Sequence, residues 1–243
     1  MSKIALVTGA AKRIGASCVK LLHAEGFNIV LHYHQSRREA LDLAGELNGQ
    51  RADSVFTFRA DLLVLDDVKR LAMDACHIFG GVDVLINNAS AFYPTPMGRV
   101  QETDWDVLMG SNLKAPFFLS QGLASMLAER QGCIVNIVDI HAERGLPGYP
   151  VYSIAKAGLV AMTKCLAKEL APHVRVNAVA PGAIMWPEAE ISDDQKAEIL
   201  HKVALARCGC EADIARAVKF LIADADYVSG QVLSVDGGRL LYS

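Results

Sequence analysis

The sequence has no long hydrophobic run, although 52% of its 243 residues are hydrophobic. A membrane-spanning helix needs about 20 consecutive apolar residues, and no stretch approaches that length. At the N-terminus only about five apolar residues precede Thr8-Gly9, too few for the apolar region of a secretion signal. These two absences predict a cytoplasmic protein.

An excess of positive charge is also absent. The chain carries 24 Lys and Arg against 27 Asp and Glu, which gives a formal net charge of −3. The basic pairs Lys12-Arg13 and Arg37-Arg38 are local and form no stripe along one element. Because proteins that bind nucleic acid or anionic membranes present clustered positive charge, the composition argues against both kinds of partner.

The six cysteines lack the spacing of a disulfide framework or a zinc site. Cys208-Gly-Cys210 is a close pair, but no second pair of Cys or His accompanies it. Structural zinc requires four ligands at recognisable spacings. We therefore expect free thiols and no metal.

The sequence does have a regular alternation of short apolar runs and longer stretches of helical periodicity. The predicted strands cover residues 4–7, 28–33, 55–59, 82–86, 133–138, 174–178 and 231–235. The predicted helices cover residues 14–25, 37–47, 65–79, 102–111, 115–129, 149–170 and 211–223.

This alternation predicts an α/β fold. Strands that are apolar on both faces and joined by helices form a parallel sheet that is covered on both sides. We expect a single Rossmann-type, doubly wound parallel sheet of about seven strands with helices on both faces. No linker-like stretch divides the chain, so one dinucleotide-binding domain is expected over 1–243. The longest irregular pieces, 144–150 and 180–194, follow strands, and a substrate loop is expected around 181–201.

A glycine turn joins the first strand to the first helix, in the segment Val7-Thr-Gly-Ala-Ala-Lys-Arg-Ile-Gly15. In this context, backbone N–H groups and the helix N-terminus face the pyrophosphate of a dinucleotide. Arg13 replaces the middle glycine of the usual pattern. An ordinary strand-to-helix turn is the alternative, but the position in the first βα unit favours the nucleotide site.

The end of the second strand discriminates between the two nicotinamide cofactors. NAD sites place Asp or Glu about 20 residues beyond the glycine turn, where the carboxylate binds the ribose 2′-OH. This chain has His32-Tyr-His-Gln-Ser36 there, followed by Arg37 and Arg38. Without a carboxylate to repel a 2′-phosphate, NADPH is predicted in preference to NADH. A metal site at His32 and His34 is the competing interpretation, and it lacks a third ligand.

Polar residues end the third and fourth predicted strands. Asp61-Leu62 and Asn87-Asn-Ala-Ser90 thus come to the carboxyl edge of the sheet, where a cofactor would lie. Asp61 has the chemistry to accept a hydrogen bond from an adenine amino group, and the small Ala89 allows a close backbone approach. Turn formation is the alternative explanation for Asn87-Asn88.

Three side chains suited to proton transfer converge near the fifth strand. Tyr152 and Lys156 are four residues apart and share one face of a predicted helix. Asp139 follows the apolar run that ends just before this region. A free tyrosine has a pKa near 10, and Lys156 is expected to lower the pKa of Tyr152 toward neutrality by favouring the phenolate. For Asp139, an ion pair with Arg144 or a loop cap is the alternative to an acid–base role.

Taken together, these segments resemble the short-chain dehydrogenase/reductase family over essentially the whole chain. The matching pieces are Thr8-Gly9 with Gly15, Asp61-Leu62, Asn87-Asn-Ala89, Asn112, Tyr152-x-x-x-Lys156, Pro181-Gly182 and Val235-Asp-Gly-Gly238. Narrower features resemble the pteridine reductases within that family: Arg13, His32-Tyr-His-x-Ser36, Asn87-Asn-Ala-Ser-Ala-Phe-Tyr-Pro-Thr-Pro96 and Asp139. Two further segments resemble the bacterial branch of these enzymes: Ile137-Val-Asp-Ile-His-Ala-Glu-Arg144 and Pro181-Gly-Ala-Ile-Met-Trp-Pro-Glu188. Most of the wider family carries Ser where this chain has Asp139. Gln35 departs from the basic residue often found in the narrower group, and Arg37 is a candidate substitute.

The resemblance implies roles for individual residues. It assigns catalysis to Asp139, Tyr152, Lys156 and Asn112, with Lys156 also holding the nicotinamide ribose and Asn112 supporting a water-linked proton path to that lysine. It implies cofactor contacts at Gly9, Arg13, Ile14, Tyr33, His34, Ser36, Asp61, Leu62, Asn88, Ala89, Ser90, Val138, Lys156, Pro181 and Gly182. It implies substrate contacts at Arg13, Ser90, Phe92, Tyr152 and Trp186, with Phe92 stacked on a pterin ring opposite the nicotinamide.

The function expected from this resemblance is NADPH-dependent reduction of dihydropterins to tetrahydropterins, with dihydrofolate as a further substrate. Tyr152 and Asp139 would assist protonation of a ring nitrogen. Two alternatives stay open: a carbonyl reductase of the same fold, acting for example on 3-oxoacyl thioesters, and a nucleotide sensor without turnover. The family also implies a homotetramer.

Overall fold

A computed structural model describes residues 2–184 and 192–242 of the chain. Seven strands form one parallel sheet in the order β3-β2-β1-β4-β5-β6-β7. This confirms the predicted doubly wound α/β fold. The strands are β1 Ile4–Val7, β2 Asn28–Tyr33, β3 Val55–Arg59, β4 Val84–Asn87, β5 Cys133–Ile137, β6 Arg175–Pro181 and β7 Val232–Val235.

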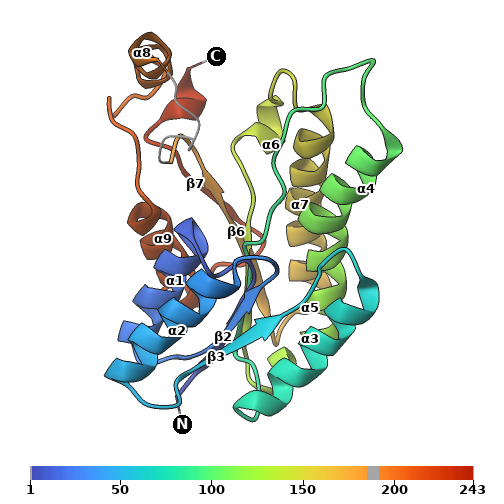
Figure 1. The fold of residues 1–243 in the computed structure, drawn as a ribbon, viewed down its shortest axis with the longest axis vertical. Coiled ribbons are helices and arrows are strands. Elements are labelled where there is room, and N and C mark those ends of the chain that lie inside the picture. Colours follow the sequence, from blue (N-terminus) through green and yellow to red (C-terminus); the bar gives the residue numbers. More distant parts are fainter. Residues whose placement is uncertain (1, 185–191, 243) are drawn as a thin grey trace.

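Helices cover both faces of the sheet. In Figure 1, α1, α2 and α9 lie on one side of it and α3, α4, α5 and α7 on the other. The helices are α1 Arg13–Ala24, α2 Arg37–Gln50, α3 Leu65–Ile78, α4 Glu102–Met109, α5 Ala115–Glu129, α6 His141–Arg144, α7 Pro150–Glu169, α8 Asp193–His201 and α9 Glu211–Ala223. A π-helical turn, η1 Gly110–Lys114, joins α4 to α5, and a 3-10 turn, η2 Arg239–Leu241, lies near the C-terminus.

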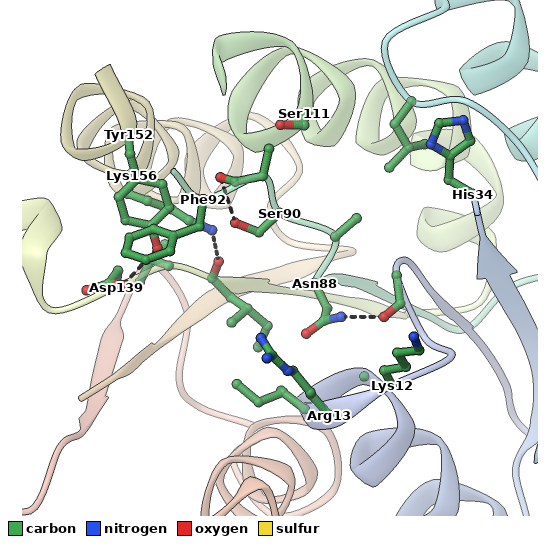
Figure 2. A pocket seen from close by; sticks show the side chains of 18 of the residues that line it. Lys12, Arg13, His34, Asn88, Ser90, Phe92, Ser111, Asp139, Tyr152 and Lys156 are labelled. Atoms are coloured by element: carbon green, nitrogen blue, oxygen red, sulfur yellow. Dashed lines mark hydrogen bonds between the residues drawn. The ribbon is translucent and has the colours of Figure 1, made fainter. Parts of the chain in front are cut away.

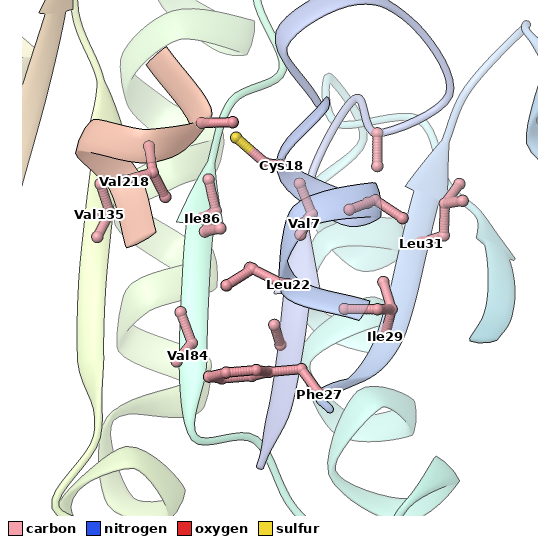
Figure 3. Close-up of a cluster of buried hydrophobic side chains, with 14 of the residues drawn as sticks. Val7, Cys18, Leu22, Phe27, Ile29, Leu31, Val84, Ile86, Val135 and Val218 are labelled. Carbon is pink, nitrogen blue, oxygen red and sulfur yellow. The ribbon is translucent and has the colours of Figure 1, made fainter. Parts of the chain in front are cut away.

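The core explains why the strands are apolar throughout. Successive side chains of a strand point to opposite faces, so the central strands contribute to two buried layers. In β1, Val7 packs into the layer beneath α1, α2 and α9, whereas Leu6 packs into the layer beneath α3 and α5. Figure 3 shows the first layer, with Leu22 and Val218 packed over the strands. Because helices cover both faces, neither face of these strands requires polar side chains.

Most predicted elements are found, and the differences have local causes. The bounds of β2, β3, α5 and α9 agree with the prediction. The structure adds two helices that were not predicted, α6 and α8, and it shows that β6 continues to Pro181. The helix α6 has only four residues, and α8 is polar, so neither has the apolar periodicity used to predict helices.

The order of the strands in the sheet changes direction between β1 and β4. β1 lies between β2 and β4, so the connections from β1 and from β4 leave in opposite directions. In open α/β sheets, ligands bind beyond the carboxyl ends of the strands at such a point. Among the described residues, no helix is long and apolar enough to cross a membrane.

Candidate active site

A cavity of about 700 Å³ lies at the carboxyl edge of the sheet. Its walls come from the glycine turn after β1, the ends of β2, β4, β5 and β6, the segment after β3, and helices α4 and α7. Figure 2 shows the side chains that point into it, with Lys12 and His34 toward one end and Asp139, Tyr152 and Phe92 toward the other. After the roles predicted from the sequence, we name the end with Lys12 and His34 the nucleotide end and the end with Asp139, Tyr152 and Phe92 the reaction end.

Close packing explains the glycines of the turn. Gly9 has a φ of +58°, and a Cβ there would lie 2.8 Å from the Cα of Ala89. A Cβ on Gly15 would lie 2.4 Å from the carbonyl oxygen of Gly9. Arg13 adopts a φ of +51°, so this arginine keeps the left-handed conformation in place of the family's middle glycine. The turn therefore keeps its shape and gains a long cationic side chain on the cavity wall.

Hydrogen bonds from two neighbouring strands fix the turn in place. The amide of Asn88 donates to the carbonyl oxygens of Thr8 (2.9 Å) and Gly9 (3.0 Å), and the hydroxyl of Thr8 accepts from the backbone N–H of Asn88 and of Ala89. The Nδ1 of His32 accepts from the Gly9 N–H (3.1 Å), and its Nε2 donates to the carbonyl oxygen of Ala60 (3.1 Å). His32 is thus a neutral structural residue, and burial lowers its pKa to about 4.

Two pairs of ionisable side chains lie at the nucleotide end of the cavity. The Nε2 of His34 is 3.6 Å from the Oδ2 of Asp61, and the Nζ of Lys12 is 2.6 Å from the Oε1 of Glu39. Lys12 lines the cavity although the sequence analysis assigned it no role. Its position in the glycine turn, next to Arg13, is the sequence feature from which a cavity-lining role could have been predicted. Among the described residues, no group of three or more metal-ligating side chains is present, so His32 and His34 belong to no metal cluster there.

At the reaction end, Asp139 binds Tyr152 directly. The hydroxyl of Tyr152 donates to the Oδ2 of Asp139 at 2.8 Å, and the Oδ1 of Asp139 accepts from the backbone N–H of His141 at 2.8 Å. Arg144, the alternative partner, instead donates to the carbonyl oxygens of Arg239 and Tyr242. The carboxylate therefore faces the cavity and not a buried arginine.

The effect on Tyr152 is opposite to the one expected from Lys156. Burial and the neighbouring Asp139 carboxylate raise the pKa of Tyr152 well above its ordinary value. Lys156 also affects the pKa of Tyr152 less than predicted. Its Nζ lies 5.7 Å from the centre of the Tyr152 ring and donates a hydrogen bond to the carbonyl oxygen of Ile137 at 2.8 Å. Burial lowers the pKa of Lys156 to about 8, with a partial opposing effect from Asp139. In the protein alone, Tyr152 is a neutral phenol.

Asn112 is fully buried at the π-helical turn and does not line the cavity. Its Nδ2 donates to the carbonyl oxygens of Ala91 and Leu108, both at 2.9 Å, and its Oδ1 accepts from the hydroxyl of Ser90 at 2.6 Å. A π-helical turn widens the backbone locally and is frequent at functional sites. It presents the carboxamide of Asn112 to the cavity-lining residue Ser90 and not to Lys156.

Phe92 forms an aromatic wall next to Tyr152. Its ring stacks on Tyr149 with centroids 4.6 Å apart and planes 9° apart, and it meets Tyr152 edge-on at 4.8 Å. The side chain is 55% exposed, which is high for a large apolar residue. Trp186, the other predicted aromatic contact, lies outside the described residues.

The structure brings most of the predicted site residues to one cavity. Tyr33 is an exception, because its side chain is buried in the core, and Ser36 precedes α2 without lining the cavity. Predicted residues on the cavity wall are Gly9, Arg13, Ile14, His34, Asp61, Leu62, Asn88, Ala89, Ser90, Phe92, Val138, Asp139, Tyr152, Lys156, Pro181 and Gly182. Residues on the wall without a predicted role include Lys12, Gly15, Leu63, Ala91, Val107, Ser111, Ile137 and Ile184. Most of the latter are apolar or small, and such residues have no distinctive sequence signal.

Comparison with known proteins places this site in a family. Residues 9–239 match the model of the family described as enoyl-(acyl carrier protein) reductase. The chain belongs to the short-chain dehydrogenase/reductase family. It is accordingly an oxidoreductase that uses a nicotinamide cofactor.

Relatives within this family carry two different names. Two 3-oxoacyl-[acyl-carrier-protein] reductases named FabG, from Staphylococcus aureus and Staphylococcus epidermidis, are each 38% identical to this short-chain reductase, over 99% of its chain and at least 99% of theirs. Pteridine reductase 1 from Leishmania tarentolae is 37% identical, over 98% of this chain and 96% of its own. A blue fluorescent protein from a metagenomic library, solved in complex with NADPH, superposes with a TM-score of 0.92 at 34% identity, covering 98% of this chain and 97% of its own. Overall identity therefore does not separate the two activities.

Proposed function

We propose that this short-chain reductase uses NADPH to reduce a ring C=N bond of a dihydropterin, giving the tetrahydropterin, with dihydrofolate as a related substrate. The observation that carries the proposal is the 2.8 Å hydrogen bond between Tyr152 and Asp139. This bond places the carboxyl group of Asp139 beside Tyr152, at the position where most members of the wider family carry a serine whose hydroxyl suits a carbonyl oxygen.

The chemistry of the two substrate classes explains why this difference matters. Reduction of a ketone needs hydrogen bonds to the carbonyl oxygen, which Tyr and Ser hydroxyls provide. Reduction of a ring C=N bond needs a proton at nitrogen as hydride reaches carbon, and a carboxyl group coupled to a phenol is suited to that delivery. The pair holds one proton, because the Asp139 carboxylate raises the pKa of Tyr152 and keeps the phenol protonated, and this is the proton delivered to the ring nitrogen as hydride reaches carbon.

The remaining walls suit a flat heteroaromatic ring. Phe92 is 55% exposed, stacks on Tyr149 and meets Tyr152 edge-on with ring centroids 4.8 Å apart. Arg13 and Ser90 line the same cavity and offer a cation and a hydroxyl to the polar edge of a pterin. Aromatic stacking is worth about 0.5–1.5 kcal/mol beyond burial, so Phe92 would orient the ring and the polar groups would select it.

The nucleotide end fits a phosphorylated dinucleotide. The glycine turn and the N-terminus of α1 provide backbone N–H groups for the pyrophosphate, and Lys156 is placed to hold the nicotinamide ribose. Lys12 in the turn before α1 offers a cation, and His34, just after β2, offers a hydrogen-bonding group. The strand β2 itself has no carboxylate that would repel a 2′-phosphate. NADPH, which supplies the hydride, is therefore favoured over NADH.

Reduction of a 3-oxoacyl thioester is the second candidate, because the FabG relatives are slightly more similar to this chain, at 38% identity, than the pteridine reductase is, at 37%. That reaction also uses Tyr152 as proton donor to the substrate. It gives no role to the carboxylate of Asp139 or to the exposed ring of Phe92.

Substitution of Asp139 tests the proposed chemistry. Asp139→Asn keeps an oxygen to accept the His141 N–H, but its neutral amide removes the negative charge beside the Tyr152 hydroxyl. We expect kcat for dihydropterin to fall by about 10²–10⁴-fold, the usual contribution of a general acid, while the Kd for NADPH, measured by nicotinamide fluorescence, stays within about threefold of wild type. Weakened NADPH binding with unchanged turnover would instead assign Asp139 to the cofactor and contradict the proposal.

A further inference from the structure

The structure distinguishes between two side chains that could supply positive charge at the nucleotide end of the cavity. Gln35, just after β2, lies on the cavity wall but is a neutral amide. Arg37, the substitute considered from the sequence, is the first residue of α2 and does not line the cavity. Lys12 does line it, from the turn before α1. The ammonium of Lys12 is therefore better placed than the guanidinium of Arg37 to meet a phosphate group.

A carboxylate outside the cavity wall is paired with Lys12. The Nζ of Lys12 lies 2.6 Å from the Oε1 of Glu39, which is in the first turn of α2. Glu39 itself does not line the cavity. The two side chains are 51% and 43% exposed, so water surrounds much of the pair and the pair adds little to the stability of the fold. Lys12 can therefore exchange this partner for another anion at a small cost in free energy.

A second carboxylate at this end of the cavity has different partners. The Oδ2 of Asp61 lies 3.6 Å from the Nε2 of His34, and its Oδ1 accepts the backbone N–H of Leu63 at 3.0 Å. Each oxygen of Asp61 thus has a neighbour other than Lys12. Of these two carboxylates, Glu39 is the one that loses its partner when an anion binds to Lys12.

A 2′-phosphate bound by Lys12 would come close to the carboxylate of Glu39. A phosphate monoester carries a charge of about −1.5 to −2 at pH 7, and the ammonium has three N–H donors with which to bind it. Because Glu39 lies beside that ammonium, its negative charge repels the phosphate even through water. NADH has a hydroxyl in place of this phosphate, so the charge of Glu39 affects the binding of NADH far less.

We propose that Glu39 determines how strongly this short-chain reductase discriminates NADPH from NADH. It pairs with Lys12 in the free protein, and Lys12 turns to the 2′-phosphate when NADPH binds. Loss of the ion pair and repulsion of the phosphate both weaken the binding of NADPH, whereas NADH requires neither. Glu39 thus limits the preference for NADPH. The inference rests on the proposed use of NADPH, but it does not depend on which substrate is reduced.

The test compares the dissociation constants of the wild-type protein and of Glu39→Gln, which keeps the length of the side chain and removes its charge. We expect the Kd of NADPH, measured by nicotinamide fluorescence, to fall by about 3–10-fold, and the Kd of NADH to stay within about twofold. In calorimetry, adenosine 2′,5′-bisphosphate should bind more tightly by a similar factor, and adenosine 5′-monophosphate should not. Because these two probes lack the nicotinamide, the measurement does not involve the reaction end.

The chain offers a matched control on the same two helices. The Nζ of Lys20 on α1 lies 3.0 Å from the Oε2 of Glu46 on α2, with side chains 52% and 50% exposed, and neither residue lines the cavity. Glu46→Gln makes the same change in net charge and should leave both Kd values within about twofold. Lys12→Met is the complementary variant, and it should raise the Kd of NADPH by about 10-fold or more and that of NADH much less.

Four results would overturn the inference, provided that equal thermal midpoints show the variants to be folded. Weaker NADPH binding in Glu39→Gln would show that Glu39 positions Lys12 for the phosphate. Unchanged NADPH binding in a protein that prefers NADPH would refute the role of Glu39 alone. Equal effects of Glu39→Gln and Glu46→Gln would assign the change to net charge. A wild-type protein that binds NADH more tightly than NADPH would refute the proposed cofactor and this inference with it.

Discussion

At the scale of single residues, the site depends on the hydrogen bonds that its buried ionisable side chains make. Lys156 is almost fully buried, and its ammonium donates a hydrogen bond to the carbonyl oxygen of Ile137. Burial disfavours the charged ammonium and therefore lowers the pKa of Lys156. Tyr152 is 5% exposed, and its hydroxyl donates a hydrogen bond to Asp139. Strongly perturbed pKa values cluster at functional sites, so two such groups on one cavity wall support a catalytic role for this cavity.

His32 gives a prediction about pH and stability. Its pKa is lowered from 6.5 to about 4, so the folded protein holds it neutral where the unfolded chain would bind a proton. Stability contributed at neutral pH is therefore lost as the pH falls from about 6.5 to about 4, by roughly 3 kcal/mol at 1.36 kcal/mol per pKa unit. In urea denaturation, His32→Leu is expected to be less stable than wild type at pH 7, because the Gly9 N–H and the Ala60 carbonyl lose their partner. It is also expected to lose less stability than wild type between those pH values.

The exposed His77 on α3 provides the control for this prediction. His77→Gln should keep the pH dependence of the wild-type protein. An acid-induced loss of stability that is identical in wild type and His32→Leu would show that other groups cause it.

At the scale of elements, the turn between β1 and α1 is the most constrained segment of the site. Side chains from β2 and from the segment after β4 bind its backbone, and small residues allow the two segments to approach. The sequence predicted the position of this turn because glycines and a following helix are local signals. It did not predict that His32 would fix the turn, because that contact depends on how far β2 is shifted along β1.

Two glycine substitutions test this constraint. In Gly15→Ala the new Cβ would lie 2.4 Å from the Gly9 carbonyl oxygen and 2.7 Å from the Nδ2 of Asn88. We expect a loss of about 1–3 kcal/mol in the free energy of unfolding, the usual cost of overpacking, together with weaker NADPH binding. The matched control is Gly45→Ala in α2, where nothing lies within 4 Å of the new Cβ. It should gain about 0.5–1 kcal/mol and keep NADPH affinity. Equal effects of the two substitutions would contradict the account of the turn.

At the scale of the whole molecule, the sheet brings residues together that are far apart in the chain. The alternation of apolar strands and helices was sufficient to predict the doubly wound sheet, because each signal is local and repeated. The site was predicted less completely. The partner of Asp139 and the direction of the Tyr152 pKa shift depend on packing between β5, α6 and α7. The π-helical turn that redirects Asn112 leaves no pattern in the sequence.

The assembly expected from the family stays a prediction. Large apolar side chains are exposed on three helices of one side of the sheet, namely Trp105 on α4, Phe117 on α5 and Ile154 on α7. In the predicted homotetramer, a contact between subunits on this side would bury them.

The central claim is that the hydrogen-bonded pair Asp139–Tyr152 serves an electron-poor heterocycle in preference to a ketone. Its most direct test is the kcat/KM of the wild-type protein with NADPH for dihydrobiopterin, dihydromonapterin and dihydrofolate, measured beside an acetoacetyl thioester. We predict a higher kcat/KM for at least one dihydropterin than for the thioester, and a ratio that reverses in Asp139→Ser. Efficient reduction of the thioester with no measurable reduction of any pterin or folate would contradict the account.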